Sequence, residues 1–531
     1  MSPRKPSYRA SSWATLGLVA CLGGCAAEEG EPLAPSDNEP AAQATAAVPS
    51  DGSVGSTVVT TAGAVAGEVA NEAGKRVLVF RGVPYAAAPT GTLRWKAPQP
   101  VTPWSGARDA TKWGDRCPQG ESTLSSPGST SEDCLNLSVL TPAAKTAEKL
   151  PVMVFFHGGG LTVGTGNSPT YGHTALPAQG VVTVLVNHRL GAFGYFSHPA
   201  LAKESGKDTS GNYGTLDLIA SLEWVKQNIT AFGGDPGNVT IFGESGGGTK
   251  VLSCMASPLA KGLFHRAIIE SGSASSAQGG TTPRATAEER GQKLATKLGV
   301  ADGDVLAGLR AKSWQDVLTA STATDSGFVT NLAIDGQVLT QSIYDTFAAG
   351  KQADVPLIVG ANQGEVRELS NTVPGLAAAH KTVSSKAYVY NFSHLPVGWR
   401  TPGCYAFHGL ELPYVFGHIA GIPGETIKFL GNAARCEVNR DPQSGPEDQT
   451  VANSTMKIWV QFAKTGNPSV PGLVDWPAYT AEGDQYLDIA AELKVKKGVR
   501  TSGIAPGTGA APATTPPTPP SPPAAQPAPS K

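Results

Sequence analysis

The sequence has almost no excess of charge of either sign, because 41 Lys and Arg stand against 43 Asp and Glu. Proteins that grip the phosphates of nucleic acid need a surplus of basic residues, so we do not expect nucleic-acid binding. After Cys25 the chain lacks an apolar run of membrane-spanning length, which argues against a bundle of transmembrane helices. No unit of about 20 to 50 residues repeats, which excludes solenoids and propellers.

Cysteine is scarce, and its spacing fits no zinc site. Five cysteines follow Cys25 in the chain: Cys117, Cys134, Cys254, Cys404 and Cys436. A bond between Cys117 and Cys134 would close a short loop rich in Ser and Gly. A second pair, Cys404 with Cys436, would leave Cys254 as the free and buried thiol of this odd-numbered set.

The segment 1–25 has the features of an export signal, with basic residues at the start and an uncharged apolar stretch from Trp13 to Gly24. Two short strings, LVAC ending at Cys21 and LGGC ending at Cys25, resemble the lipidation motif of bacterial lipoproteins. We therefore expect an exported protein. Either it is held at the membrane of the cell envelope by a lipid on Cys25 or Cys21, or it is secreted through a plain signal.

Composition divides the rest of the chain into three parts. Residues 26–55 and 501–531 are rich in Ala, Pro and small polar residues and cannot build a core, so a disordered tether and a disordered Pro-rich tail are expected there. Hydrophobic residues make up 40% of the whole chain, enough for a large core in residues 56–500. We expect these residues to form the one catalytic domain.

Strand-like and helix-like stretches alternate within this domain. Residues 152–156 and 181–186 are β-branched and aromatic without polar alternation, which is typical of strands covered on both faces. A helical period over 216–225, a Gly-rich turn at 233–238 and a short strand at 239–242 follow. This order predicts an α/β fold with a mostly parallel sheet, helices on both faces and sites at the carboxyl ends of the strands.

Two glycine-rich strings follow predicted strands and suit a serine nucleophile. Gly243-Glu244-Ser245-Gly246-Gly247 comes after strand 239–242 and before a helical run, the context of a nucleophile elbow. His157-Gly158-Gly159-Gly160 follows strand 152–156 and could turn backbone N–H groups toward a developing oxyanion. Ser245 would then need an acid and a histidine further along the chain, in that order.

The chain resembles the type-B carboxylesterases, the relatives of cholinesterases within the α/β-hydrolase superfamily. The blocks that carry this resemblance are 80–85, 93–95, 131–137, 187–191, 211–248, 360–365 and 408–417. The resemblance implies the α/β-hydrolase fold and a triad of Ser245, Glu365 and His408. It also implies oxyanion donors at Gly159, Gly160 and Gly246, a Cys117–Cys134 disulfide, and a structural ion pair between Glu132 and Arg189.

Other interpretations compete with these assignments. Glu365 could be a solvated loop carboxylate, since Glu is mostly exposed in proteins. His408 competes with three other histidines, and its place beside an apolar run favours it. The competitors are His157, which we expect to be structural, His394 and His418.

The chain departs from the family pattern in two places. Only 43 residues separate Glu365 from His408, which predicts a reduced cap and a shallower, more open pocket. The loop between Cys117 and Cys134 has no aromatic residue, so it cannot hold a quaternary ammonium by a cation–π contact, and choline esters are disfavoured.

The expected function is therefore hydrolysis of a small carboxylic ester through an acyl-enzyme, without a metal or an organic cofactor and with no obligate protein partner. Two alternatives stay open. The same machinery could act on lipids, lactones or amides, or the protein could be a non-catalytic binding protein at the cell surface.

Overall fold

The computed structural model describes residues 51–121, 129–273, 280–300, 303–365, 367–421 and 441–499. The predicted export signal, both candidate lipidation cysteines, the Pro-rich tail and all but the last five residues of the predicted tether lie outside these ranges. Val54 is buried, and its amide donates to the carbonyl of Ala144 at 2.8 Å, so the folded body begins slightly before residue 56. In the described ranges, no helix is both long enough and apolar enough to span a bilayer.

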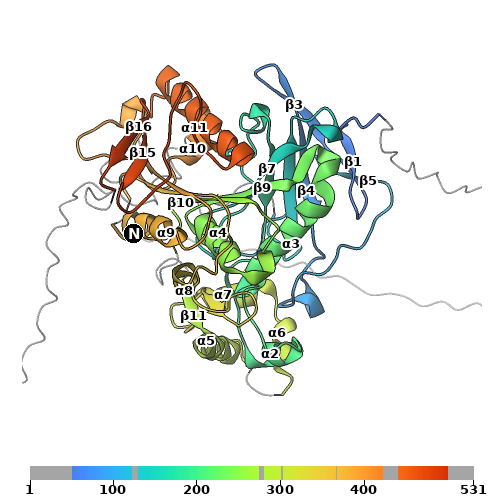
Figure 1. Ribbon diagram of the computed structural model, residues 1–531. Coiled ribbons are helices and arrows are strands. Elements are labelled where there is room, and N and C mark those ends of the chain that lie inside the picture. Colours follow the sequence, from blue (N-terminus) through green and yellow to red (C-terminus); the bar gives the residue numbers. More distant parts are fainter. Residues whose placement is uncertain are drawn as a thin grey trace, which may run out of the picture. The chain divides into compact units, whose positions relative to one another are not determined.

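An 11-stranded sheet forms the centre of the fold (Figure 1). Its strands lie in the spatial order β16 (Lys494–Lys497), β15 (Gln485–Ile489), β14 (Ala387–Phe392), β13 (Leu357–Asn362), β10 (Arg266–Glu270), β9 (Gly234–Glu244), β7 (Leu150–Phe156), β8 (Val182–Val186), β6 (Asn136–Thr141), β4 (Lys75–Pro84) and β3 (Glu68–Glu72). Neighbours from β15 through to β8 pair in parallel, and the strands outside this run pair antiparallel. The predicted mostly parallel sheet is confirmed.

Strand β7 is buried on both faces, as its unbroken apolar sequence predicts. Val154 and Phe156 point into one core, which also contains side chains of α3 (Tyr213–Asn228), α4 (Gly246–Ala256), α8 (Ile343–Ala348) and α9 (Arg367–His380). Met153 and Phe155 point into a second core, formed with α10 (Leu412–Val415) and α11 (Pro446–Thr465). The sheet therefore has helices on both faces.

Smaller elements surround this sheet. A third core joins α1 (Gly191–Gly194), α2 (Pro199–Glu204), α5 (Arg284–Lys297), α6 (Val305–Arg310) and α7 (Trp314–Thr322). In Figure 1, α2, α5, α6 and α7 lie together on the side away from α10 and α11. Strands β1 (Thr57–Val59), β2 (Ala64–Ala66) and β5 (Ala107–Asp109) form one small sheet, and β11 (Thr281–Pro283) and β12 (Leu332–Ile334) form another.

The predicted turn at 233–238 is largely wrong, because β9 already begins at Gly234. Gly234 pairs with Leu150, and the ladder resumes where Val239 pairs with Val152. The residues between, which include Pro236 with no N–H to donate, form an irregularity inside one long strand. The stretch between Glu365 and His408, for which a reduced cap was predicted, contains α9 and β14. The shallower and more open pocket stays a prediction.

Candidate active site

Ser245 lies in the sharp turn between the end of β9 and the start of α4. Its backbone has φ 58° and ψ −123°, a conformation rare for a residue with a side chain. Its amide donates to the carbonyl of Glu270 at 2.8 Å, which ties the turn to the end of β10. Ser245 is partly exposed while Glu244 and Gly246 beside it are buried. The turn thus presents the hydroxyl-bearing residue at the carboxyl end of the sheet.

Glycines let the start of α4 pack directly against the loop after β7, at a distance that leaves no space for a side chain. A Cβ on Gly246 would lie 2.2 Å from the carbonyl oxygen and 2.4 Å from the nitrogen of Gly160, and one on Gly247 would lie 2.0 Å from the carbonyl oxygen of Phe156. Gly159 and Gly160 have φ values of 87° and 61°, which favour glycine. The structure brings the three predicted oxyanion donors together beside the turn at Ser245.

Glu365 is fully buried, so its interpretation as a solvated loop carboxylate is wrong. Its Oε1 lies 3.3 Å from Nδ1 of His408. The same oxygen accepts a hydrogen bond from the hydroxyl of Ser271 and one from the amide of Asn362, the latter at 3.1 Å. These two donors hold the carboxylate in place against the imidazole.

The other ring nitrogen of His408 faces the turn that contains Ser245. Nε2 lies 3.2 Å from Oε1 of Glu244, the residue that precedes Ser245. Burial alone would lower the pKa of His408, but the charges of Glu244 and then Glu365 outweigh it and raise this pKa to about 10. Burial raises the pKa of Glu244 to about 7, although the charge of His408 opposes that rise. The imidazole is therefore held between two carboxylates.

Sequence reasoning missed the residues that support this arrangement, namely Glu244, Ser271, Asn362 and Glu411. Asn362 donates through Nδ2 to the carbonyl of Phe407 at 2.7 Å and to the side chain of Glu411. Burial, and after it the charge of Glu244, raises the pKa of Glu411 well above its ordinary value. Glu244, Asn362 and Glu411 lie inside the strings 243–247, 360–365 and 408–417, and this was the one signal available. Ser271 lies in none of them.

The competing histidines have other partners. His157 is buried with Nδ1 2.8 Å from the carbonyl oxygen of Gly158, and its ring lies over that of His188. His394 binds Asp448 at 2.8 Å, and His418 stacks on His173. Over the described ranges, no group of three or more His, Cys, Asp or Glu side chains is arranged to hold a metal ion.

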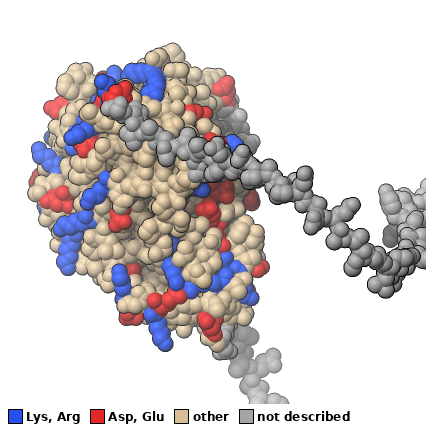
Figure 2. Space-filling view, turned by 90° about the vertical axis from the view of Figure 1, so that its right-hand side faces the viewer, with Lys and Arg blue, Asp and Glu red and all other residues tan. Residues whose placement is uncertain are grey.

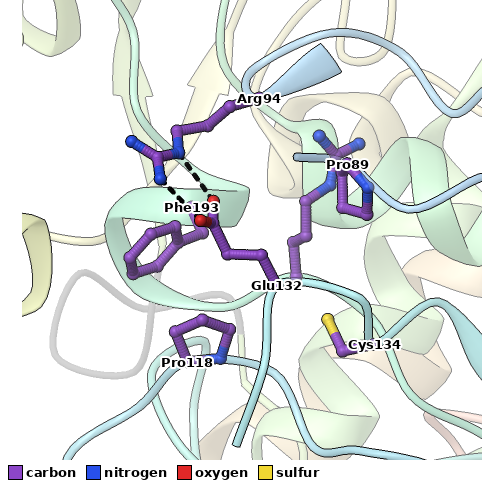
Figure 3. A pocket seen from close by; sticks show the side chains of 7 residues that line it. Pro89, Arg94, Pro118, Glu132, Cys134 and Phe193 are labelled. Carbon is purple, nitrogen blue, oxygen red and sulfur yellow. Dashed lines mark hydrogen bonds and ion pairs between the residues drawn. The ribbon is translucent and has the colours of Figure 1, made fainter. Parts of the chain in front are cut away.

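The expected ion pair between Glu132 and Arg189 is wrong, because each residue has a different partner. Glu132 pairs with Arg94 through two hydrogen bonds, which Figure 3 shows beside a small pocket lined also by Cys134. Arg189 pairs with Asp217 of α3 through bonds of 2.8 and 2.7 Å. Both arginines are buried, and a buried guanidinium needs a carboxylate of its own.

The disulfide between Cys117 and Cys134 is confirmed, and Cys254 is free and buried as predicted. Cys436 lies outside the described residues, so its pairing with Cys404 stays a prediction.

Removing the Cys117–Cys134 bond by the double substitution of both cysteines with serine is expected to lower the free energy of unfolding by about 3 kcal/mol. The reason is that the bond closes a loop with a sequence separation of 17 residues and so restricts the unfolded chain. Urea unfolding checks this value, with the Cys254→Ser variant as the control that loses a cysteine but no bond. An unchanged midpoint in the double variant would contradict the expectation.

A model of the carboxylesterase family matches residues 55–376 and 368–505. Para-nitrobenzyl esterase of Bacillus subtilis (strain 168) is 32% identical over 477 residues, covering 78% of this chain and 92% of that relative. Fumonisin B1 esterase of Sphingopyxis macrogoltabida is 32% identical over 466 residues, covering 77% and 82%. Human cocaine esterase is 32% identical over 515 residues, covering 80% and 85%.

Solved structures agree with these relatives. A PNB esterase structure superimposes with a TM-score of 0.69 at 30% identity, covering 83% of this chain and 97% of that one. A thermophilic PNB esterase reaches 0.70 with the same identity and the same coverage of both chains. The extent of these matches, together with the elbow and the sheet that carries it, shows that the chain belongs to the carboxylesterase family of α/β-hydrolases and is a carboxylic ester hydrolase.

Proposed function

We propose that this enzyme hydrolyses small carboxylic esters through a covalent acyl-enzyme formed on Ser245. The observation that carries the proposal is the position of His408, with one ring nitrogen at Glu365 and the other at the residue next to Ser245. In this proposal Ser245 is the nucleophile, His408 the general base and Glu365 the group that orients the imidazole.

The reaction follows from these roles. His408 takes the proton of the Ser245 hydroxyl through Nε2 while the oxygen attacks the ester carbonyl carbon. The N–H groups of Gly159, Gly160 and Gly246 donate hydrogen bonds to the carbonyl oxygen as it becomes negatively charged. Losing one such donor typically lowers the rate by about 10²- to 10³-fold. His408 then gives the proton to the departing alcohol. Water repeats the sequence on the acyl-enzyme and releases the acid.

Glu244 should set the pH at which His408 becomes a base. Its negative charge favours the imidazolium, and a charged imidazole cannot accept the proton of Ser245. In Glu244→Gln this stabilisation is lost, so the pKa of His408 falls. We expect the acid limb of the profile of kcat/KM against pH to move down by about one to two pH units.

Glu411→Gln serves as the matched control for this experiment. The charge of Glu411 contributes less to the raised pKa of His408 than the charge of Glu244 does, so the amide at 411 should move the acid limb less than the amide at 244. An acid limb that stays fixed in Glu244→Gln, or moves to higher pH, would contradict the assigned electrostatics.

The relatives' names mention para-nitrobenzyl, fumonisin and cocaine esters, which supports small esters of varied alcohols as the substrate class. Figure 2 shows basic and acidic side chains interspersed over one face, so the described residues there give no field of one sign to steer a charged substrate. Rates on a short-chain ester, a long-chain ester and the matching amide separate the proposal from lipase and amidase activity. Faster hydrolysis of the long-chain ester or the amide would favour those alternatives.

A binding protein without catalysis is the remaining alternative, and the buried site argues against it. Burying Glu244, Glu365 and His408 together costs free energy of folding. Such clusters of buried ionisable groups are typical of catalytic sites. Covalent labelling of Ser245 by a fluorophosphonate tests this directly. Export, with or without a lipid on Cys21 or Cys25, is proposed from the sequence of the segment 1–25 alone.

A further inference from the structure

Lys250 is a buried amine on the helix that follows the nucleophile. It lies in α4, one and a half turns after Ser245, and is 1% exposed. Its Nζ donates to the backbone carbonyl of His157 at 2.7 Å. His157 is the residue directly before the glycines of the oxyanion loop, so this bond joins that loop to α4.

The surroundings of Lys250 leave its amine without a carboxylate in ion-pair contact among the described residues. Glu244 is the carboxylate whose charge acts on it, and burial lowers the pKa of Lys250 well below its ordinary value. The rings of His157 and His188 lie 4.6 Å apart. Burial, and after it the charge of Lys250, lowers the pKa values of both imidazoles well below their ordinary value.

Such a lysine does not serve packing alone. Lysine is almost never fully buried without a paired charge, and a buried amine with a carbonyl acceptor is costly compared with an apolar side chain of the same length. A methionine could fill the same space. The position therefore suggests that the hydrogen bond to His157 has a use beyond stability.

We propose that Lys250 is a positioning residue for the oxyanion hole, acting through the peptide between His157 and Gly158. The peptide unit is planar, so holding the carbonyl of His157 also sets the direction of the Gly158 N–H and the start of the loop. Gly158 is packed tightly, since a Cβ there would lie 2.9 Å from Oε2 of Glu244 and 3.5 Å from Cβ of Ser245.

The bond from Lys250 adds to other contacts of this loop, since Nδ1 of His157 lies 2.8 Å from the carbonyl oxygen of Gly158 and the amide of Val163 donates to the carbonyl of Gly159 at 3.1 Å. Gly159 and Gly160 have positive φ values, and little in their own chemistry fixes them. Helix α4 supplies the third predicted donor, Gly246, and also carries Lys250. One rigid element thus holds both parts of the oxyanion hole. This inference rests on the proposed ester hydrolysis.

Lys250→Met tests the role, because methionine keeps the length of the stem and removes the donor. We expect kcat, counted per site titrated with a fluorophosphonate, to fall about 10- to 100-fold, and KM to change less than about threefold. The inhibition constant of a trifluoromethyl ketone, which forms an oxyanion on the serine, should rise by the same factor as kcat/KM falls. A role in stability alone would leave both quantities unchanged per titrated site.

Ser253→Ala is the matched control. Ser253 is also buried on α4, and its hydroxyl donates to the carbonyl of Lys250 at 2.7 Å, within the helix itself. Unchanged kcat per titrated site in Lys250→Met, an equal loss in Ser253→Ala, or an unaltered ketone inhibition constant would each overturn the inference. If the methionine variant does not fold, Lys250→Leu is judged by the same readouts. Failure of the wild-type enzyme to hydrolyse esters would instead contradict the proposed function.

Discussion

Replacing Ser245 by alanine is expected to lower kcat/KM for a short-chain ester by about 10⁵- to 10⁶-fold. In the proposed mechanism this substitution removes the oxygen that attacks the carbonyl carbon, so the acyl-enzyme cannot form. The oxyanion donors and the binding pocket stay, so a small residual rate above that of water should persist. Labelling by a fluorophosphonate should disappear together with turnover.

The fold of this variant should be unchanged. Alanine removes one partly exposed oxygen, and the hydrogen bond that anchors the turn comes from the backbone amide of Ser245. The melting temperature should therefore stay within about 2 °C of the wild-type value, since surface changes cost little. Ser253→Ala, which removes another serine hydroxyl nearby, should keep full activity. A Ser245→Ala enzyme with more than about a tenth of wild-type activity would refute the assignment, whatever its stability.

The sequence predicted the secondary structure best where the local residue pattern itself requires burial. The apolar run at 152–156 predicts a strand covered on both faces, because every side chain in it must be buried somewhere, and β7 does separate two cores. The turn predicted at 233–238 was wrong because the local pattern there does not determine the fold. Glycine, proline and asparagine mark a break in a ladder, and a break inside one strand has the same composition as a turn between two elements.

The fold places His408 between Glu365 and Glu244, the residue before Ser245. The proposed site residues could be named from the sequence because each belongs to a short string with its own signature. Asn362 lies only three residues before Glu365, and its bond to Glu365 is local. Ser271 could not be foreseen as a partner of Glu365, since the two residues are 94 positions apart and meet only when β10 and β13 pair side by side. The ion pair was predicted wrongly for the same reason. Charged side chains give no sign of their partner in a sequence, and Arg189 meets Asp217 through the packing of α3.

Glu365→Gln should lower kcat by about 10³- to 10⁴-fold with little change in KM. The amide keeps the volume of the carboxylate and an oxygen that can accept from Ser271 and Asn362. It removes the negative charge beside Nδ1 of His408, which in the proposed mechanism stabilises the imidazolium formed when Ser245 loses its proton. If the amide turns its NH₂ toward His408, Nδ1 must accept, and the proton then sits on the nitrogen that has to act as the base.

Glu270→Gln provides the control for this charge effect, because it makes the same exchange in another buried carboxyl group near the site. Burial raises the pKa of Glu270 to about 8, so at pH 7 its carboxyl is mostly neutral, as an amide is. The amide oxygen can still accept the bond that Trp459 donates to the carboxyl at 2.6 Å. We expect kcat within about threefold of wild type.

Equal losses in the two variants would mean that any buried Glu→Gln change disturbs the site, and Glu365 would lose its assigned role. A large loss confined to Glu365→Gln would tie catalysis to the one carboxylate at Nδ1 of the imidazole.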